Sequence, residues 1–215
     1  LASFFILSFL VIGRELYANK LYRGWQLSAL KHPVHYAEMP MLAVSPVKQM
    51  RDFDASVCKH IHKICLSTND TQVLRVTSGV KGEGKASIAR ALAVYHQKMG
   101  KTVLLVDGDL TNRSSTNRFG FKDRPGLTDY IAGNKEIKDI IVDDPMYHIP
   151  FIPAGSRINP DQKPLNLKPL IELFTVLAKD FDKIIFIDEP TGSDHLLISD
   201  MIAQRGDILV VGSGR

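Results

Sequence analysis

The chain has 215 residues, 45% of them hydrophobic, with 27 Lys and Arg against 23 Asp and Glu and a formal net charge of +4. This composition is typical of a globular protein and excludes collagen-like, disulfide-rich and intrinsically disordered chains. The sequence has no Lys/Arg run with interleaved aromatic residues, so we expect no nucleic-acid partner. Most of the excess positive charge lies within residues 1–70, which favours an anionic membrane surface as the neighbour.

An almost unbroken apolar stretch, LASFFILSFLVI, opens the chain, and Arg14, Lys20 and Arg23 follow it. The stretch is shorter than the roughly 20 residues that span a bilayer. A signal peptide carries its positive charge before the apolar run, whereas here the charge follows it. We therefore expect residues 1–13 to be the end of a transmembrane helix, with the basic residues on the cytoplasmic side. The alternative is a buried or amphipathic N-terminal helix of a soluble protein.

A proline-rich juxtamembrane connector is expected at residues 14–50, because Pro33, Pro40 and Pro46 disfavour helices and favour extended backbone. Residues 51–215 then form a single domain, which we expect to be incomplete at its C-terminal end because the chain stops directly after a predicted strand.

The chain's two cysteines, Cys58 and Cys65, both lie on a predicted helix over residues 52–66. They have no C-x-x-C spacing and no metal-ligand companions at a credible distance along the chain, so we expect reduced, partly buried thiols in a cytosolic domain. A zinc site that uses His60 or His62 is the alternative.

Short apolar runs and amphipathic stretches alternate through the rest of the chain. We expect strands at residues 73–77, 102–106, 149–152, 183–187 and 208–211. We expect helices at residues 85–99, 126–132, 165–178 and 195–203. The first of these helices has an apolar face that includes Met99, and Gly100 is expected to end it. The alternation predicts an α/β fold with a parallel sheet, in which ligands bind at the carboxyl ends of the strands.

A glycine-rich loop lies between the first strand and the first of these helices, and it fits the pattern G-x-x-x-x-G-K. Glycines allow successive backbone N–H groups to turn inward around phosphate oxygens, and the following helix adds its positive N-terminal end. Lys85 is expected to reach the β- and γ-phosphates. The predicted nucleotide-binding residues are Gly79, Val80, Lys81, Gly82, Glu83, Gly84, Lys85, Ala86 and Ser87.

Ala86 occupies the position at which phosphate-loop proteins carry the Ser or Thr whose hydroxyl binds Mg²⁺. Alanine offers no oxygen, and Ser87 lies about 100° further round the helix. Three outcomes stay open: a water molecule fills the gap, Ser87 serves through a shifted loop, or magnesium binding and turnover are weak.

Acidic residues end two of the predicted strands, in the sequences VLLVDGD and IIFIDEP. Neighbouring carboxylates at a strand end are costly unless a cation or a proton transfer uses them. Asp107 is therefore the candidate general base, and Asp109 and Asp188 are the candidate Mg²⁺ ligands. Glu189 is either the activator of a water molecule or an ordinary loop residue.

Six segments in this order resemble the cytosolic domain of bacterial tyrosine autokinases, the BY-kinases of capsule and exopolysaccharide chain-length control. They are VTSGVKGEGKAS, KTVLLVDGDL, GLTDYIAGN, IPAGSRINP, FDKIIFIDEPTGSD and DILVVGSG. The resemblance covers residues from about 71 to 215, and the family is similar in turn to the partition and septum-site ATPases. We therefore expect residues 51–215 to be a phosphate-loop nucleotide-binding domain of the deviant Walker type.

The resemblance implies ATP and Mg²⁺ as cofactors, with Lys85 and Asp107 as catalytic residues and Asp109 and Asp188 at the metal. It implies a homo-oligomer, arranged as a ring, in which each subunit phosphorylates tyrosines in the C-terminal tail of its neighbour. It also implies the bacterial inner membrane as the location, with this domain facing the cytoplasm, and the polysaccharide polymerase and export machinery as partners.

Two further positions bear on the resemblance. Val80 stands where the partition ATPases carry their signature lysine, and because the tyrosine kinases also lack that lysine, this favours the kinases. Ser56, Lys59 and His62 stand where the oligomerisation helix of the kinases carries an acid and two arginines. The favoured function is an autokinase or ATPase that regulates polysaccharide polymerisation and export. The alternatives are a regulatory nucleotide-binding module of the same system with little or no turnover, and a soluble partition-type ATPase.

Overall fold

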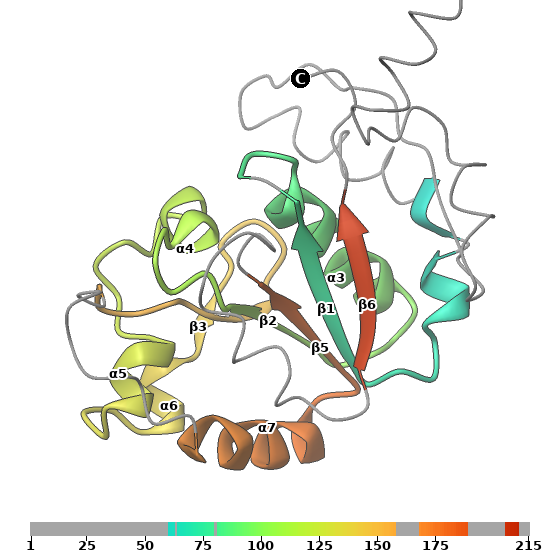
Figure 1. Ribbon diagram of the computed structural model, residues 1–215. Helices are drawn as coiled ribbons and strands as arrows, with labels where there is room; N and C mark the ends of the chain where they lie inside the picture. The colour runs from blue at the N-terminus through green and yellow to red at the C-terminus, as the bar shows by residue number, and fades with distance from the viewer. Residues whose placement is uncertain (1–59, 63, 80, 158–167, 189–204, 211–215) are drawn as a thin grey trace, which may run out of the picture.

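The computed structural model of the chain describes residues 60–62, 64–79, 81–157, 168–188 and 205–210 (Figure 1). The predicted membrane-helix end at 1–13, the connector at 14–50, the helix at 195–203 and Glu189 lie outside these residues. Within the described ranges, no helix is both long enough and apolar enough to cross a membrane.

Six strands of the described chain form one sheet in the order β3-β4-β2-β5-β1-β6. Their bounds are β1 Val73–Ser78, β2 Val103–Asp107, β3 Val142–Asp143, β4 Pro150–Ile152, β5 Lys183–Ile187 and β6 Arg205–Val210. All neighbouring pairs are parallel except β3 and β4, which are antiparallel. A parallel return needs a long crossover, whereas β3 and β4 are joined by a short loop. The prediction of a parallel sheet is therefore right for five strands and wrong for the short edge strand β3.

Five labelled helices of the described chain pack around this sheet. They are α3 Lys85–Lys98, α4 Ser114–Arg118, α5 Leu127–Ile131, α6 Ile137–Ile140 and α7 Lys168–Asp180. Residues 60–62 and 64–67 are also helical. Gly100 follows α3 with a φ of 79°, a left-handed conformation typical of a helix end, as predicted. Met99 was predicted on the apolar face of this helix, but it lies beyond the last turn of α3 and 63% of its surface is exposed.

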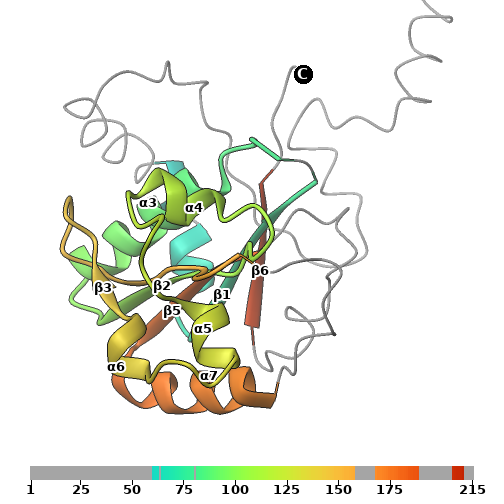
Figure 2. The ribbon, with the colours of Figure 1, turned by 90° about the vertical axis from the view of Figure 1, so that its left-hand side faces the viewer.

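Side chains alternate between the two faces of the sheet, so each face has its own hydrophobic cluster. Leu105 and Ile185 pack with α3 on one face, and Leu104 and Phe186 pack with α5, α6 and α7 on the other. Figure 2 shows α3 and α7 on opposite sides of the sheet. The parallel strands β1, β2 and β5 have their carboxyl ends at the same end of the sheet. The loops with polar side chains begin there.

The helical residues 60–62 and 64–67 are fixed to the opposite end of the sheet. Ile61 and Cys65 are buried against the α3 side of the core. The buried ammonium of Lys183, the first residue of β5, donates to the carbonyls of Thr68 (2.8 Å), Asn69 (2.5 Å) and Thr71 (2.5 Å). The ring Nδ1 of His62 lies 2.7 Å from the hydroxyl of Tyr95, so His62 contacts α3.

Candidate active site

The phosphate loop joins β1 to α3 and adopts the backbone conformation that its glycines allow. Gly82 and Gly84 have φ values of 90° and 99°, in the left-handed region that other residues rarely adopt. Gly84 is the N-cap of α3, and the N–H groups of Ser87 and Ile88 both bond to its carbonyl at 3.0 Å. The loop therefore ends at the positive end of a 14-residue helix, which is a suitable place for an anion.

Lys85 is the first residue of α3, and only 8% of its surface is exposed. Its Nζ donates a 2.8 Å hydrogen bond to Oγ of Ser78, the last residue of β1. Burial lowers the pKa of Lys85, while the charges of Asp109, Glu83, Asp188 and Asp107 act in the opposite direction. The ammonium is thus surrounded by the three predicted acids and by Glu83 of the loop itself.

Asp107 ends β2 and is completely buried. Its Oδ2 accepts two hydrogen bonds from Thr116, one from the backbone N–H and one from the hydroxyl, both of 2.7 Å. The hydroxyl oxygen of Thr116 in turn accepts the N–H of Ala154 at 2.8 Å. The pKa of Asp107 is raised to about 6, mainly by burial; the hydrogen bonds from Thr116 act against this rise, and the charge of Asp109 adds to it. An acid with this pKa is mostly ionised at neutral pH and can accept a proton.

Asp109 lies two residues further on, at the start of the loop that leads to α4. Its Oδ1 accepts the backbone N–H of Asn112 (2.9 Å) and the side-chain amide of the same residue (3.2 Å). Its Oδ2 accepts the hydroxyl of Ser114 at 2.8 Å. Asp109 is 2% exposed, and its carboxylate is held by hydrogen bonds from its own loop.

Gly108 separates the two acids because no side chain fits there. A Cβ at this position would lie 2.0 Å from the ring of Phe186 on β5. The N–H of Gly108 bonds to the carbonyl of Ile187 at 2.8 Å, so the ends of β2 and β5 are in direct contact. This contact brings Asp188, which follows β5, to the same edge as Asp107 and Asp109.

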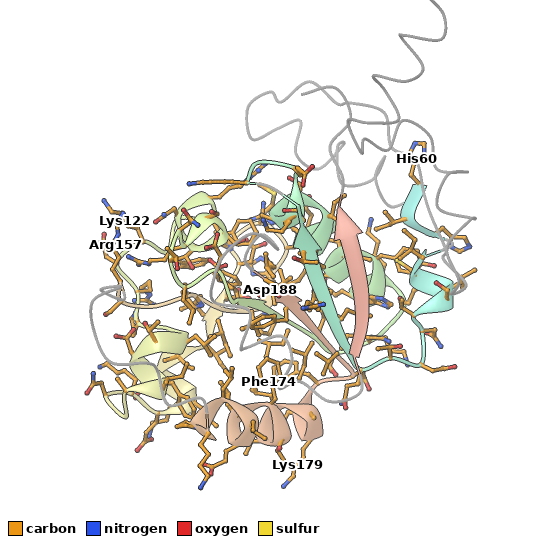
Figure 3. The ribbon with its side chains drawn as sticks, viewed as in Figure 1. His60, Lys122, Arg157, Phe174, Lys179 and Asp188 are labelled. Atoms are coloured by element: carbon orange, nitrogen blue, oxygen red, sulfur yellow. The ribbon has the colours of Figure 1, made fainter. Side chains whose placement is uncertain are left out.

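Asp188 is fixed at the end of β5 by its neighbours on β1. Its backbone N–H bonds to the carbonyl of Val76 at 2.9 Å, and its Oδ2 lies 3.4 Å from Nη1 of Arg75. Figure 3 shows Asp188 near the middle of the molecule, at the carboxyl end of the central strand β5. Arg75, which the sequence analysis did not identify, is therefore a neighbour of Asp188.

Ala86 lies on the first turn of α3, half-buried, and packs against the hydrophobic cluster on the α3 side of the sheet. Ser87 is also half-buried, and Val80 lies outside the described residues. At the positions that the structure describes, no group of three or more His, Cys, Asp or Glu residues is arranged as a metal cage. Mg²⁺ in nucleotide sites is typically held by one or two carboxylates together with phosphate oxygens. Asp109 and Asp188 fit that partial donor set. The structure does not test the zinc alternative, because Cys58 lies outside the described residues.

No protein-family model matches the chain. The tyrosine-protein kinase CpsD of Streptococcus agalactiae serotype III is 30% identical over 156 residues, which are 71% of this chain and 66% of that protein. CpsD of Streptococcus pneumoniae serotype 4 is 27% identical over 184 residues, 82% of this chain and 79% of that protein. The chain belongs to the BY-kinase family. It spans about two thirds of the length of the S. agalactiae relative.

Solved structures have the same fold as this BY-kinase domain. The kinase domain of the Escherichia coli tyrosine kinase ETK superposes with a TM-score of 0.65 at 20% identity, over 89% of this chain and 76% of that one. The septum site-determining protein MinD with Mg-ADP from Pyrococcus horikoshii superposes with a TM-score of 0.54 at 30% identity, over 66% of this chain and 58% of that one. The BY-kinase domain is thus related in fold to the septum-site ATPases.

Sequence reasoning placed the charged residues of this BY-kinase site but missed those that hold them. Lys85, Asp107, Asp109 and Asp188 come together at one edge of the sheet. The missed residues contact them through hydroxyl, amide or guanidinium groups: Ser78, Thr116, Asn112, Ser114 and Arg75. Ser78 could have been found by its place at the end of a strand that leads into the phosphate loop. The others follow from loop conformation and strand pairing, for which the sequence has no separate signal.

Proposed function

We propose that this chain is the ATP-binding cytosolic part of a membrane-anchored tyrosine autokinase that regulates capsule or exopolysaccharide polymerisation and export. One observation carries the proposal: the ammonium of Lys85, at the start of α3, interacts with Asp107, Asp109 and Asp188 from the ends of two neighbouring strands. This combination suits a triphosphate and its cation. The relatives that are named tyrosine-protein kinases support the reaction class.

Each of these residues has a proposed role in phosphoryl transfer from ATP to a tyrosine hydroxyl. Lys85, the backbone of residues 79–87 and the N-terminal end of α3 bind the phosphates. Asp107 accepts the hydroxyl proton while a bond forms from the tyrosine oxygen to the γ-phosphorus and the bond to the β-phosphate oxygen breaks, which leaves ADP. Asp109 and Asp188 hold Mg²⁺, which neutralises charge on the phosphate oxygens when it is bound.

The location and partners follow from the same proposal. The apolar start of the chain and the basic residues after it support an inner-membrane anchor with this domain on the cytoplasmic side. We propose a ring-shaped homo-oligomer in which a C-terminal tail of one subunit supplies tyrosines to the site of the next. The polysaccharide polymerase and export machinery are the proposed partners, and no nucleic acid is expected.

A regulatory module that binds nucleotide with little turnover is the second candidate, and Ala86 is the observation that favours it. Its methyl group packs against the core of the domain and offers no oxygen to Mg²⁺. Loss of one metal ligand weakens the stabilisation of charge in the transition state while the phosphate loop still binds nucleotide.

Labelled ATP with Mg²⁺ distinguishes these functions when it is given to the full-length protein and to Lys85→Ala, Ala86→Thr and Lys98→Ala variants. The autokinase predicts labelled phosphotyrosine in the parent and in Lys98→Ala, an exposed lysine in the last turn of α3, and none in Lys85→Ala. ATP binding without turnover in the parent, with turnover gained in Ala86→Thr, supports the regulatory module. A parent that binds no nucleotide contradicts both functions.

A further inference from the structure

The carboxylate of Asp109 is held by side chains of its own loop, and Asn112 supplies two of its three donors. The backbone N–H and the side-chain amide of Asn112 both bond to Oδ1, at 2.9 and 3.2 Å, and Ser114 bonds to Oδ2 at 2.8 Å. Among the described residues these three bonds leave one acceptor position of Oδ2 for a cation, since a carboxylate has about four. The loop therefore fixes the direction in which Asp109 can offer an oxygen.

A second contact ties Asn112 to the phosphate loop. Nζ of Lys81 donates to Oδ1 of Asn112 at 3.2 Å. Lysine can only donate and an ionised carboxylate can only accept, so the amide of Asn112 has one orientation that satisfies both neighbours. Its oxygen faces Lys81 and its NH₂ group faces Asp109. A continuous chain of hydrogen bonds thus runs from the phosphate loop to the predicted metal ligand.

We infer that Asn112 is a positioning residue for Asp109 and that Lys81 acts through Asn112, by holding its amide in the orientation that donates to the carboxylate. The inference rests on the proposed function, because it assumes that Asp109 serves Mg²⁺ beside a bound nucleotide. Carboxylates that bind metals are themselves hydrogen-bonded, and loss of such a partner typically weakens metal binding about 10- to 100-fold.

The other role open to Lys81 is a direct contact with phosphate, and the two roles differ in their dependence on Mg²⁺. A lysine that touches phosphate strengthens nucleotide binding with or without the metal. A lysine that orients Asn112 matters only when Asp109 is in use. Lys81 is exposed, so its replacement leaves the core intact in either case.

A double-mutant cycle on the full-length protein separates these roles, with the affinity for a fluorescent ADP analogue measured in Mg²⁺ and in EDTA. Asn112→Ala should lower affinity in Mg²⁺ about tenfold and change it less than about twofold in EDTA. Lys81→Met should weaken binding only in Mg²⁺, and the double variant should bind no worse than Asn112→Ala alone, since both changes break one chain. Lys98→Met and Asn134→Ala, which change exposed residues outside the site, are the matched controls.

The inference is overturned if the losses of affinity in Asn112→Ala and Lys81→Met add up in the double variant in Mg²⁺. It is also overturned if Lys81→Met loses as much affinity in EDTA as in Mg²⁺. Either result leaves the proposed function standing. A parent that binds no nucleotide overturns both. A measurement without ligand gives an independent check: the NMR signal of the Asn112 side-chain amide should shift in Lys81→Met and not in Lys98→Met. An unshifted signal contradicts the contact itself.

Discussion

Thr116 shows how one hydroxyl can hold a buried carboxylate in place, here that of Asp107, the proposed general base. It donates to Asp107 and accepts from the N–H of Ala154, and all three groups are buried. Thr116→Val keeps the shape of the side chain but leaves a carboxylate oxygen short of a donor and an N–H without its acceptor. We expect a loss of about 1–3 kcal/mol in the free energy of unfolding, measured by urea denaturation. Thr116→Ser retains the hydroxyl and should lose much less; equal losses would show that the methyl group matters instead.

Position 108 must be a glycine because the ring of Phe186 packs directly against it. This contact leads to a second prediction at the residue scale. The missing Cβ of Gly108 would meet the ring of Phe186 at 2.0 Å. We expect Gly108→Ala to lower the free energy of unfolding by about 1–3 kcal/mol through overpacking. Combining it with Phe186→Leu, which shortens the opposing side chain, should give less than the sum of the two single losses. Additive losses would show that the strain lies in the backbone and not in this contact.

The residues that the sequence could identify are those whose role follows from spacing along the chain. Lys85 was placed by its loop pattern, and Asp107, Asp109 and Asp188 by their position after apolar strands. Thr116 and Asn112 could not be placed in this way. Each is an ordinary polar residue in a loop or a short helix, and its partner is fixed only by how the chain after β2 folds back.

At the scale of elements, Lys183 joins the helical residues 60–62 and 64–67 to the start of β5. Its ammonium donates to the carbonyls of Thr68, Asn69 and Thr71, which follow the last helical turn. Lys183→Met removes these charge-assisted hydrogen bonds, although the carbonyl of Thr68 keeps the backbone N–H of Thr71 at 3.1 Å. We expect a loss of about 2–4 kcal/mol in the free energy of unfolding, together with faster hydrogen exchange in residues 60–71.

Lys179 provides the matched control for this change. It lies on the exposed face of α7, and Figure 3 shows its side chain pointing away from the molecule. Lys179→Met should leave both unfolding and exchange unchanged. If Lys183→Met exchanges like the parent at residues 60–71, the helical segment is held by Ile61 and Cys65 and the lysine contributes little.

Long elements were predicted more accurately than short ones, for a physical reason. Strands β2 and β5 are built on continuous apolar runs buried on both faces, β1 is a mostly buried strand rich in β-branched residues, and α3 and α7 have a clear helical period. The short helices α4 and α6, and the two-residue strand β3, contain too few residues for a period to be visible. Tertiary contacts determine such short elements, since a single helical turn is unstable alone.

At the scale of the whole molecule, the stability of the fold should depend on pH through His96, near the end of α3. The residue is 1% exposed, and its Nε2 has no hydrogen-bond partner among the described residues. The pKa of His96 is lowered from 6.5 to about 4, mainly by burial and also by the nearby charges of Lys183 and Lys101. Between pH 6.5 and about pH 4, His96 therefore holds a proton in the unfolded chain but not in the folded chain.

This difference fixes the sign of the effect. The contribution of His96 to stability is complete above pH 6.5 and is lost as the pH falls towards 4. Asp107 acts in the opposite direction, because its raised pKa of about 6 favours the fold as the pH falls from there towards 3.8. A comparison of the parent with His96→Phe cancels the term from Asp107, since both proteins contain it.

We therefore expect the free energy of unfolding of the parent, relative to that of His96→Phe, to be about 2 kcal/mol lower at pH 5 than at pH 7.5, measured by urea denaturation at both values. Phenylalanine fills a similar volume and does not titrate, so any constant packing difference cancels between the two pH values. Replacing the exposed His60 by Phe should leave the pH dependence of the parent in place. Identical pH profiles for the parent and His96→Phe would mean that the imidazole is protonated in the fold, and that the lysines near it do not exclude a further positive charge from the end of α3.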